Sequence, residues 1–145
     1  MNRRDYSTAS CVAGIAISIL LTACGGQQSA GTEATAVAAT GDPSMMISFR
    51  TLGAPSKGDN KVEAIVRRTD GTPITDAAVS VTFRMPPMPS MNMPEMHSTA
   101  PLTHAADGRY VGTGELEMAG TWNVTVAVSR DGAQTGSARF TVIAK

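Results

Sequence analysis

Beyond residue 42, hydrophobic and polar residues alternate with a period of two along much of the chain. The alternation is clearest over residues 79–84 and 122–129, where Val, Phe and Trp alternate with Ser, Thr, Asn, Ala and Arg. Side chains of a β-strand point alternately to opposite faces, so each of these segments predicts a strand with one buried face. Further alternation predicts five more strands, at residues 45–52, 61–68, 99–104, 109–116 and 134–143. No stretch shows the period of a helix.

The connections between these seven segments are of two kinds. Every second connection holds a tight-turn dipeptide, and these are Asp70-Gly71, Asp107-Gly108 and Asp131-Gly132. The other three hold residues 53–60, a methionine-rich segment and residues 117–120. Successive antiparallel strands return the chain to alternate ends of a domain, so each kind should share one end. We therefore predict an all-β fold, a seven-stranded antiparallel immunoglobulin-like sandwich, with its functional end at the longer connections.

This arrangement predicts positions for residues outside the methionine-rich segment. Trp122, the only tryptophan, should lie at the centre of the core. Met118 should lie at the functional end, packed beside Trp122. Met45 and Met46 begin the first strand at the opposite end, where we expect both to contribute to the core.

The N-terminal residues resemble an export signal. Two arginines precede an apolar run over residues 11–21, which is too short to span a bilayer. The run ends in Leu21-Thr22-Ala23-Cys24, which resembles a bacterial lipobox, and this resemblance implies cleavage before Cys24 and lipidation of that cysteine. We therefore expect a lipoprotein signal peptide over residues 1–23. The alternative is an ordinary signal peptide that leaves Cys24 as a free thiol.

The residues after the signal separate it from the β domain. Residues 24–42 are small and polar without lasting periodicity, which predicts a flexible tether from the lipidated Cys24. Residues 43–145 then form one small domain. We expect a protein of the cell envelope, anchored through its N-terminal lipid and facing the periplasm. Gly25 stands where an aspartate usually marks inner-membrane retention, which favours the outer membrane.

Composition excludes several classes of function. Without residues 1–23 the chain has ten basic and eleven acidic side chains, so it lacks the positive charge expected of a nucleic-acid-binding domain. It has two histidines and, once Cys24 is lipidated, no thiol, which leaves little for a Ser-His-Asp or Cys-His arrangement. No glycine-rich phosphate loop follows a predicted strand. We therefore expect a protein that is not an enzyme.

The candidate chemistry lies in the methionine-rich segment. Five of the nine methionines and both histidines fall between residues 85 and 104, in the sequence MPPMPSMNMPEMHSTAPLTH. Thioethers are soft, stay unprotonated, and select Cu(I) over hard cations. Useful affinity needs about three or four converging donors, and imidazole is an acceptable partner. The segment therefore predicts a copper site, with Cu(I) favoured.

The prolines limit how the thioethers can converge. Polyproline II geometry would spread Met85, Met88 and Met91 along a stripe, too far apart for all three to bind one ion, so a single site requires the loop to curl. We expect a curled loop to gather five ligands, Met88, Met91, Met93, Met96 and His97. Participation by Met85, His104 or Met118 stays open.

Three features together resemble the YtkA-like family of small extracytoplasmic domains. They are Pro73-Ile74-Thr75-Asp76-Ala77 before a strand, the Met-Pro run over residues 85–96, and Gly108-Arg109-Tyr110 followed by Met118-Ala119-Gly120-Thr121-Trp122. The resemblance covers roughly residues 60–130. It implies a β-sandwich and, in many relatives, copper handling or assembly of copper-containing respiratory enzymes.

Two hypotheses of different class follow. The first is an envelope lipoprotein that binds copper through the Met/His-rich loop, for buffering, resistance or delivery to a cuproenzyme. Its partners would then include copper-transport or cytochrome oxidase assembly proteins. The second is a metal-free immunoglobulin-like module that docks a membrane complex through the Met-Pro loop.

Overall fold

The computed structural model describes residues 33–34 and 38–145, which form nine β-strands and one short 3₁₀ turn. All strand pairs are antiparallel. The elements are β1 (Glu33–Ala34), β2 (Ala38–Gly41), β3 (Met45–Thr51), β4 (Gly58–Arg68), β5 (Ala78–Met85), η1 (Pro89–Met91), β6 (Met96–Ala106), β7 (Arg109–Leu116), β8 (Gly120–Arg130) and β9 (Ala133–Ala144).

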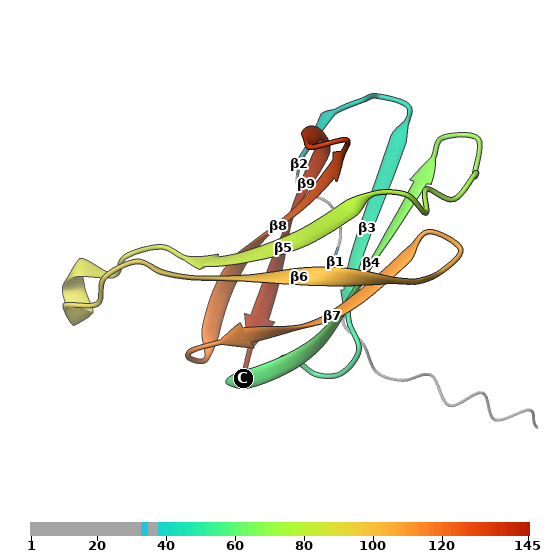
Figure 1. Ribbon diagram of the computed structural model, residues 1–145. Helices are drawn as coiled ribbons and strands as arrows, with labels where there is room; N and C mark the ends of the chain where they lie inside the picture. Colours follow the sequence, from blue (N-terminus) through green and yellow to red (C-terminus); the bar gives the residue numbers. More distant parts are fainter. Residues whose placement is uncertain (1–32, 35–37) are drawn as a thin grey trace, which may run out of the picture.

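The strands follow one another in a single continuous sheet, in the order β1-β3-β4-β7-β6-β5-β8-β9-β2 (Figure 1). The sheet folds over at β6, whose residues 96–102 pair with β5 and whose residues 103–106 pair with β7. Its two edge strands, β1 and β2, are separated by three residues of chain. A trans peptide advances the chain at most about 3.8 Å, so these edges lie close together and the sheet is nearly barrel-shaped.

The seven segments predicted from alternation correspond to the strands β3 to β9. The largest differences are at the starts of β4 and β6, which begin at Gly58 and Met96, each three residues before the predicted start. Two short strands were not predicted. β1 and β2 lie in the range expected to be a tether, where β2 pairs with residues 136–139 of β9.

The core fills the space enclosed by the folded sheet. Trp122 is fully buried, as expected, and the other large buried side chains are Phe49, Phe83, Tyr110 and Phe140. Phe49 packs edge-on against Phe83, with ring centroids 6.3 Å apart. β5, β7, β8 and β9 alternate buried and more exposed positions over most of their length, and β6 does so over residues 99–103, which is the period-two pattern seen in the sequence.

The connections alternate between two ends of the domain. Asp107-Gly108 and Asp131-Gly132 are two-residue turns in which both residues have positive φ, the conformation preferred in tight hairpins. The N–H of Val66 donates to the carbonyl of Gly108, which joins the β6–β7 turn to the end of β4. At the other end, the N–H of Lys145 donates to the carbonyl of Pro55 in the β3–β4 connection.

The expected signal peptide over residues 1–23 and the expected lipidation site Cys24 lie outside the described residues. Within residues 33–34 and 38–145, no helix has the length and apolar character needed to cross a membrane.

Candidate metal-binding loop

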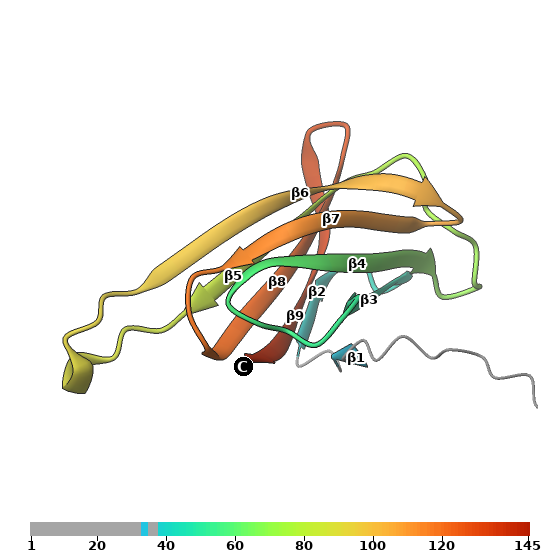
Figure 2. The ribbon, with the colours of Figure 1, turned by 90° about the horizontal axis from the view of Figure 1, so that it is seen from below.

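The methionine-rich segment forms the end of a β-ribbon that protrudes from the body of the sheet (Figures 1 and 2). Met85 of β5 lies opposite Met96 of β6 at the base of the ribbon. Three residues further along each arm, Met88 lies opposite Met93 in an isolated bridge. The same register therefore continues from the sheet to the tip, although residues between the two pairs form no ladder.

The tip is closed by a short turn. The N–H of Met88 donates to the carbonyl of Met93 at 3.0 Å, and the N–H of Met93 donates to the carbonyl of Met88 at 3.2 Å. Between them, Pro89–Met91 form the 3₁₀ turn η1, and the N–H of Met91 also donates to the carbonyl of Met88. Asn92 ends this turn with φ 49° and ψ 37°, the left-handed conformation that asparagine tolerates well. The loop is therefore curled.

Curling brings three of the five predicted ligands into one turn. Met88 and Met93 share a hydrogen-bonded cross-strand pair, in which Cα atoms are about 5.5 Å apart and side chains leave the ribbon on the same face. Met91 lies between them in the chain and is 56% exposed. Met88 and Met93 are half-buried, and Met88 packs against the hydrophobic core. We call these three residues the tip methionines.

Met96 belongs to a different group, at the base of the ribbon. It is half-buried and packs against the core, opposite the buried Met85. Met118, in the β7–β8 connection, also packs against the core, and its carbonyl accepts a hydrogen bond from Nε1 of Trp122 at 3.0 Å. This placement agrees with the packing expected for Met118.

His97 is directed away from Met96, because neighbouring residues of a strand face opposite sides of the sheet. Its cross-strand partner is Arg84, and both side chains are exposed on the outer face. Arg84 donates to Glu95 at 2.5 Å, and this hydrogen bond lowers the pKa of the Glu95 carboxyl. If the predicted strand had begun at residue 96, its alternation would have placed Met96 and His97 on opposite faces.

The remaining candidates lie apart from the tip. His104 is exposed on β6, with its ring edge-on to Tyr110 at a centroid distance of 5.2 Å. Met45 packs against the core as expected. The expectation for Met46 is wrong: it is 55% exposed, because it alternates with Met45 and faces outward from β3.

The donor atoms of the tip are chemically suited to a soft ion. Within the part of the chain that the structure describes, no three His, Cys, Asp or Glu side chains are placed to hold a metal ion together. The tip methionines offer three neutral thioether sulfurs on a turn closed by its own backbone hydrogen bonds, and such donors suit Cu(I). The sequence analysis did not identify Asn92, the residue whose left-handed backbone ends this turn. An asparagine inside a Met-Pro run was the signal, because asparagine tolerates this conformation.

A family model described as YtkA-like matches residues 44–127. The match includes β3 to β7, the whole ribbon and most of β8. No curated protein and no solved structure matches the chain.

Proposed function

The chain belongs to the YtkA-like family, and on this premise we propose that it is an envelope lipoprotein that binds copper, as Cu(I), through the tip of the β5–β6 ribbon. Lipid on Cys24 anchors it, and the β domain faces the periplasm from the outer membrane. In this proposal the seven strands β3 to β9 form an immunoglobulin-like sandwich, and β1 and β2 extend its edges.

The observation that carries the copper proposal is the closed turn between Met88 and Met93. A closed turn restricts the positions of its side chains before a ligand binds, which lowers the entropy lost on binding. The three tip methionines then supply the soft donors. Because Met91 is more than half exposed, an ion held here is accessible to another molecule. This accessibility suits buffering, resistance or delivery to a cuproenzyme through copper-transport or cytochrome oxidase assembly partners.

We rank the five predicted ligands by their positions on the ribbon. Met88, Met91 and Met93 are the principal donors. Met96 lies three residues from Met93, which is about 10 Å along an extended strand, and it faces the core beside Met85. His97 leaves the opposite face. We propose that Met96 and His97 contribute less to affinity than the tip methionines.

The test is anaerobic competition for Cu(I) on the full chain, with Met91→Ser as the diagnostic variant. Changing a residue that merely orients a ligand typically lowers metal affinity about 10- to 100-fold, so loss of a ligand should cost at least this much. Met46→Ser is the matched control, because Met46 is exposed to nearly the same extent at the opposite end. Equal Cu(I) affinities for the two variants would contradict copper binding at the tip.

A second function is favoured by the exposed apolar surface of the ribbon. Pro86, Pro87, Pro89 and Pro94 are exposed together with Met91. Such a surface on a protruding element suits a module that docks a membrane complex without a metal. This alternative predicts that Met91→Ser weakens the association with a partner complex, while the full chain shows no Cu(I) affinity above that of a methionine-containing peptide.

A further inference from the structure

The outer face formed by β5, β8 and β9 carries no carboxylate at its outward positions. These positions hold hydroxyl, amide, small and basic side chains, and one isoleucine. Two arginines are the cations of this face, Arg84 near the end of β5 and Arg139 midway along β9. Their surroundings suit a negatively charged group.

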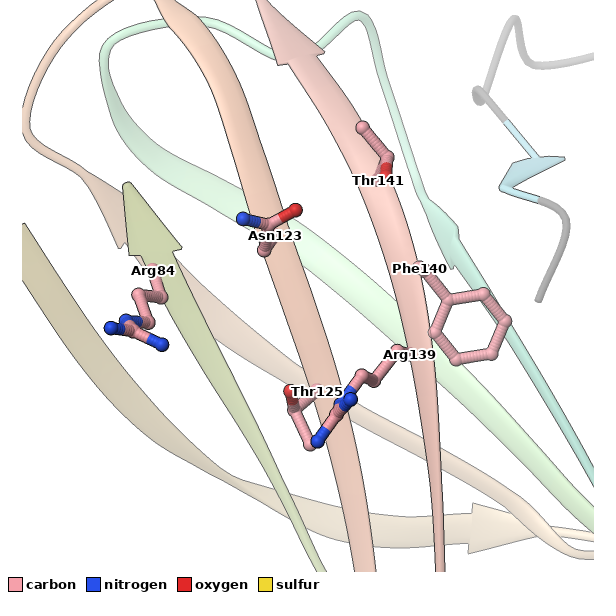
Figure 3. Close-up of a pocket in the computed structure, with 6 residues that line it drawn as sticks. All are labelled: Arg84, Asn123, Thr125, Arg139, Phe140 and Thr141. Carbon is pink, nitrogen blue, oxygen red and sulfur yellow. The ribbon is translucent and has the colours of Figure 1, made fainter. Parts of the chain in front are cut away.

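Register places the two arginines on either side of β8. Arg84 lies opposite Asn123, and Arg139 lies opposite Thr125. Asn123 and Thr125 are two residues apart on β8, so both side chains rise between the arginines. Two strand spacings across and two residues along give a separation of about 12 Å between the arginine Cα atoms. Figure 3 shows this arrangement, with Arg139 extending toward Thr125.

These side chains line a hollow of about 410 Å³. The polar residues around it are Arg84, Asn123, Thr125, Arg139 and Thr141. Arginine presents several N–H donors in a planar fork, the amide of asparagine presents two, and each threonine hydroxyl presents one. The hollow therefore concentrates donors and positive charge without a carboxylate on its floor.

The two arginines differ in their present partners. Arg84 forms an ion pair with Glu95 at 2.5 Å, at the base of the methionine ribbon. Among the residues that the structure describes, Arg139 forms no ion pair. A ligand in the hollow therefore competes with Glu95 for Arg84 but with no such carboxylate for Arg139.

We propose that this hollow binds a phosphate group, either free or in a phospholipid headgroup. Arg139 and the Asn123 amide donate to phosphate oxygens, the hydroxyls of Thr125 and Thr141 add further donors, and Arg84 supplies the second cation. Arginine forks match the geometry of phosphate oxygens, and hydrogen bonds between charged partners are the strong ones. The site is independent of copper, since none of these residues belongs to the tip methionines.

The test uses the full chain and two probes, inorganic phosphate and a short-chain phosphatidylglycerol kept below its micelle threshold. Amide chemical shifts in NMR spectra report where each probe binds. We expect shifts at Asn123 and Thr125 with at least one probe. Arg139→Gln should weaken that binding about tenfold, which is the worth of one charge-assisted hydrogen bond. A response to phosphate identifies the free ion as a ligand, and a response to the lipid alone identifies the headgroup.

Two further variants make the result decisive. Arg67→Gln removes the same charge from an exposed arginine on β4, away from the hollow, and should leave binding unchanged. Glu95→Gln removes the carboxylate that competes for Arg84 and should tighten binding severalfold. The proposal is overturned if neither probe shifts Asn123 and Thr125, or if Arg139→Gln and Arg67→Gln bind alike.

Discussion

Met88 and Met93 exchange two backbone hydrogen bonds across the tip of the β5–β6 ribbon, in the register that Met85 and Met96 establish at its base. The turn between them is thus closed by hydrogen bonds of its own backbone. Its sulfur atoms can then be removed one at a time while the turn stays closed. Because the backbone closes the turn and the side chains supply the sulfur, substitution of single methionines tests the copper proposal.

Asn92 holds the tip closed in a backbone conformation that few residues adopt without strain. Left-handed backbone costs roughly 1–2 kcal/mol for a residue with a β-carbon, and more for a β-branched one. We expect Asn92→Val to open the Met88–Met93 bridge and to lower Cu(I) affinity roughly 5- to 30-fold. Asn92→Gly should keep both the bridge and the affinity, because glycine adopts positive φ freely. Hydrogen exchange at the Met88 amide, measured beside the Cu(I) competition, tests both outcomes.

Gly114 allows Phe83 to pack against β7. A β-carbon added at Gly114 would overlap Cε2 of the Phe83 ring, which is fully buried. We expect Gly114→Ala to lower the free energy of unfolding by about 1–3 kcal/mol, the usual cost of overpacking a core. Gly53→Ala is the matched control, because no atom lies within 4 Å of its added β-carbon. Urea denaturation should separate the two variants, and equal midpoints would contradict this account.

Glu63 is a buried carboxylate held between two half-exposed arginines. Its side chain is 3% exposed and lies 2.7 Å from Arg50 and 3.3 Å from Arg109. Removing both arginines leaves a buried charge without a partner, which typically costs about 3–5 kcal/mol. Removing the carboxylate costs less, because the arginines can turn toward water. We therefore expect Arg50→Gln/Arg109→Gln to be less stable to urea than Glu63→Gln, and the reverse order would show that the arginines do not stabilise Glu63.

Asp70 makes the stability of the fold depend on pH in the acidic range. Its carboxylate accepts the backbone N–H of Thr72 at 2.8 Å, and this hydrogen bond lowers its pKa from the ordinary 3.8. A lowered folded-state pKa adds stability that is present above the unfolded pKa and lost as pH falls through the folded value. Asp70→Asn keeps an acceptor for Thr72 but does not titrate. Urea midpoints measured below pH 4 should fall less steeply for Asp70→Asn than for the unmodified chain, and parallel curves would count against the linkage.

Alternation in the sequence was sufficient to predict the strands that bury a hydrophobic face. It located β3 to β9 because each has apolar residues at every second position, and the Asp-Gly turns fixed where two hairpins reverse. It missed β2 because the sequence Ala38–Gly41 has no alternation of apolar and polar residues, and the structure shows this strand through its backbone pairing to β9. Hydrogen bonding of this kind leaves no period in the sequence.

The sequence named five candidate ligands but did not predict which of them lie together in the structure. The predicted ligand set joined Met96 to His97, because both were assigned to the loop and not to the start of β6. Strand boundaries inferred from sequence are uncertain by a few residues, and one residue of difference reverses the face of a side chain. The turn at Asn92 depends on a left-handed backbone conformation, whereas the surrounding prolines favour polyproline II geometry.

The prolines of the protruding ribbon have one more consequence, which concerns contact between copies of the chain. A long hairpin standing clear of its domain would offer two open edges to a strand from a second molecule. Pro86, Pro87 and Pro94 have no N–H to give such a strand, and they fall where the ladder between the two methionine pairs is interrupted. The ribbon can therefore display soft sulfur at a distance from the domain without becoming a template for edge-to-edge aggregation.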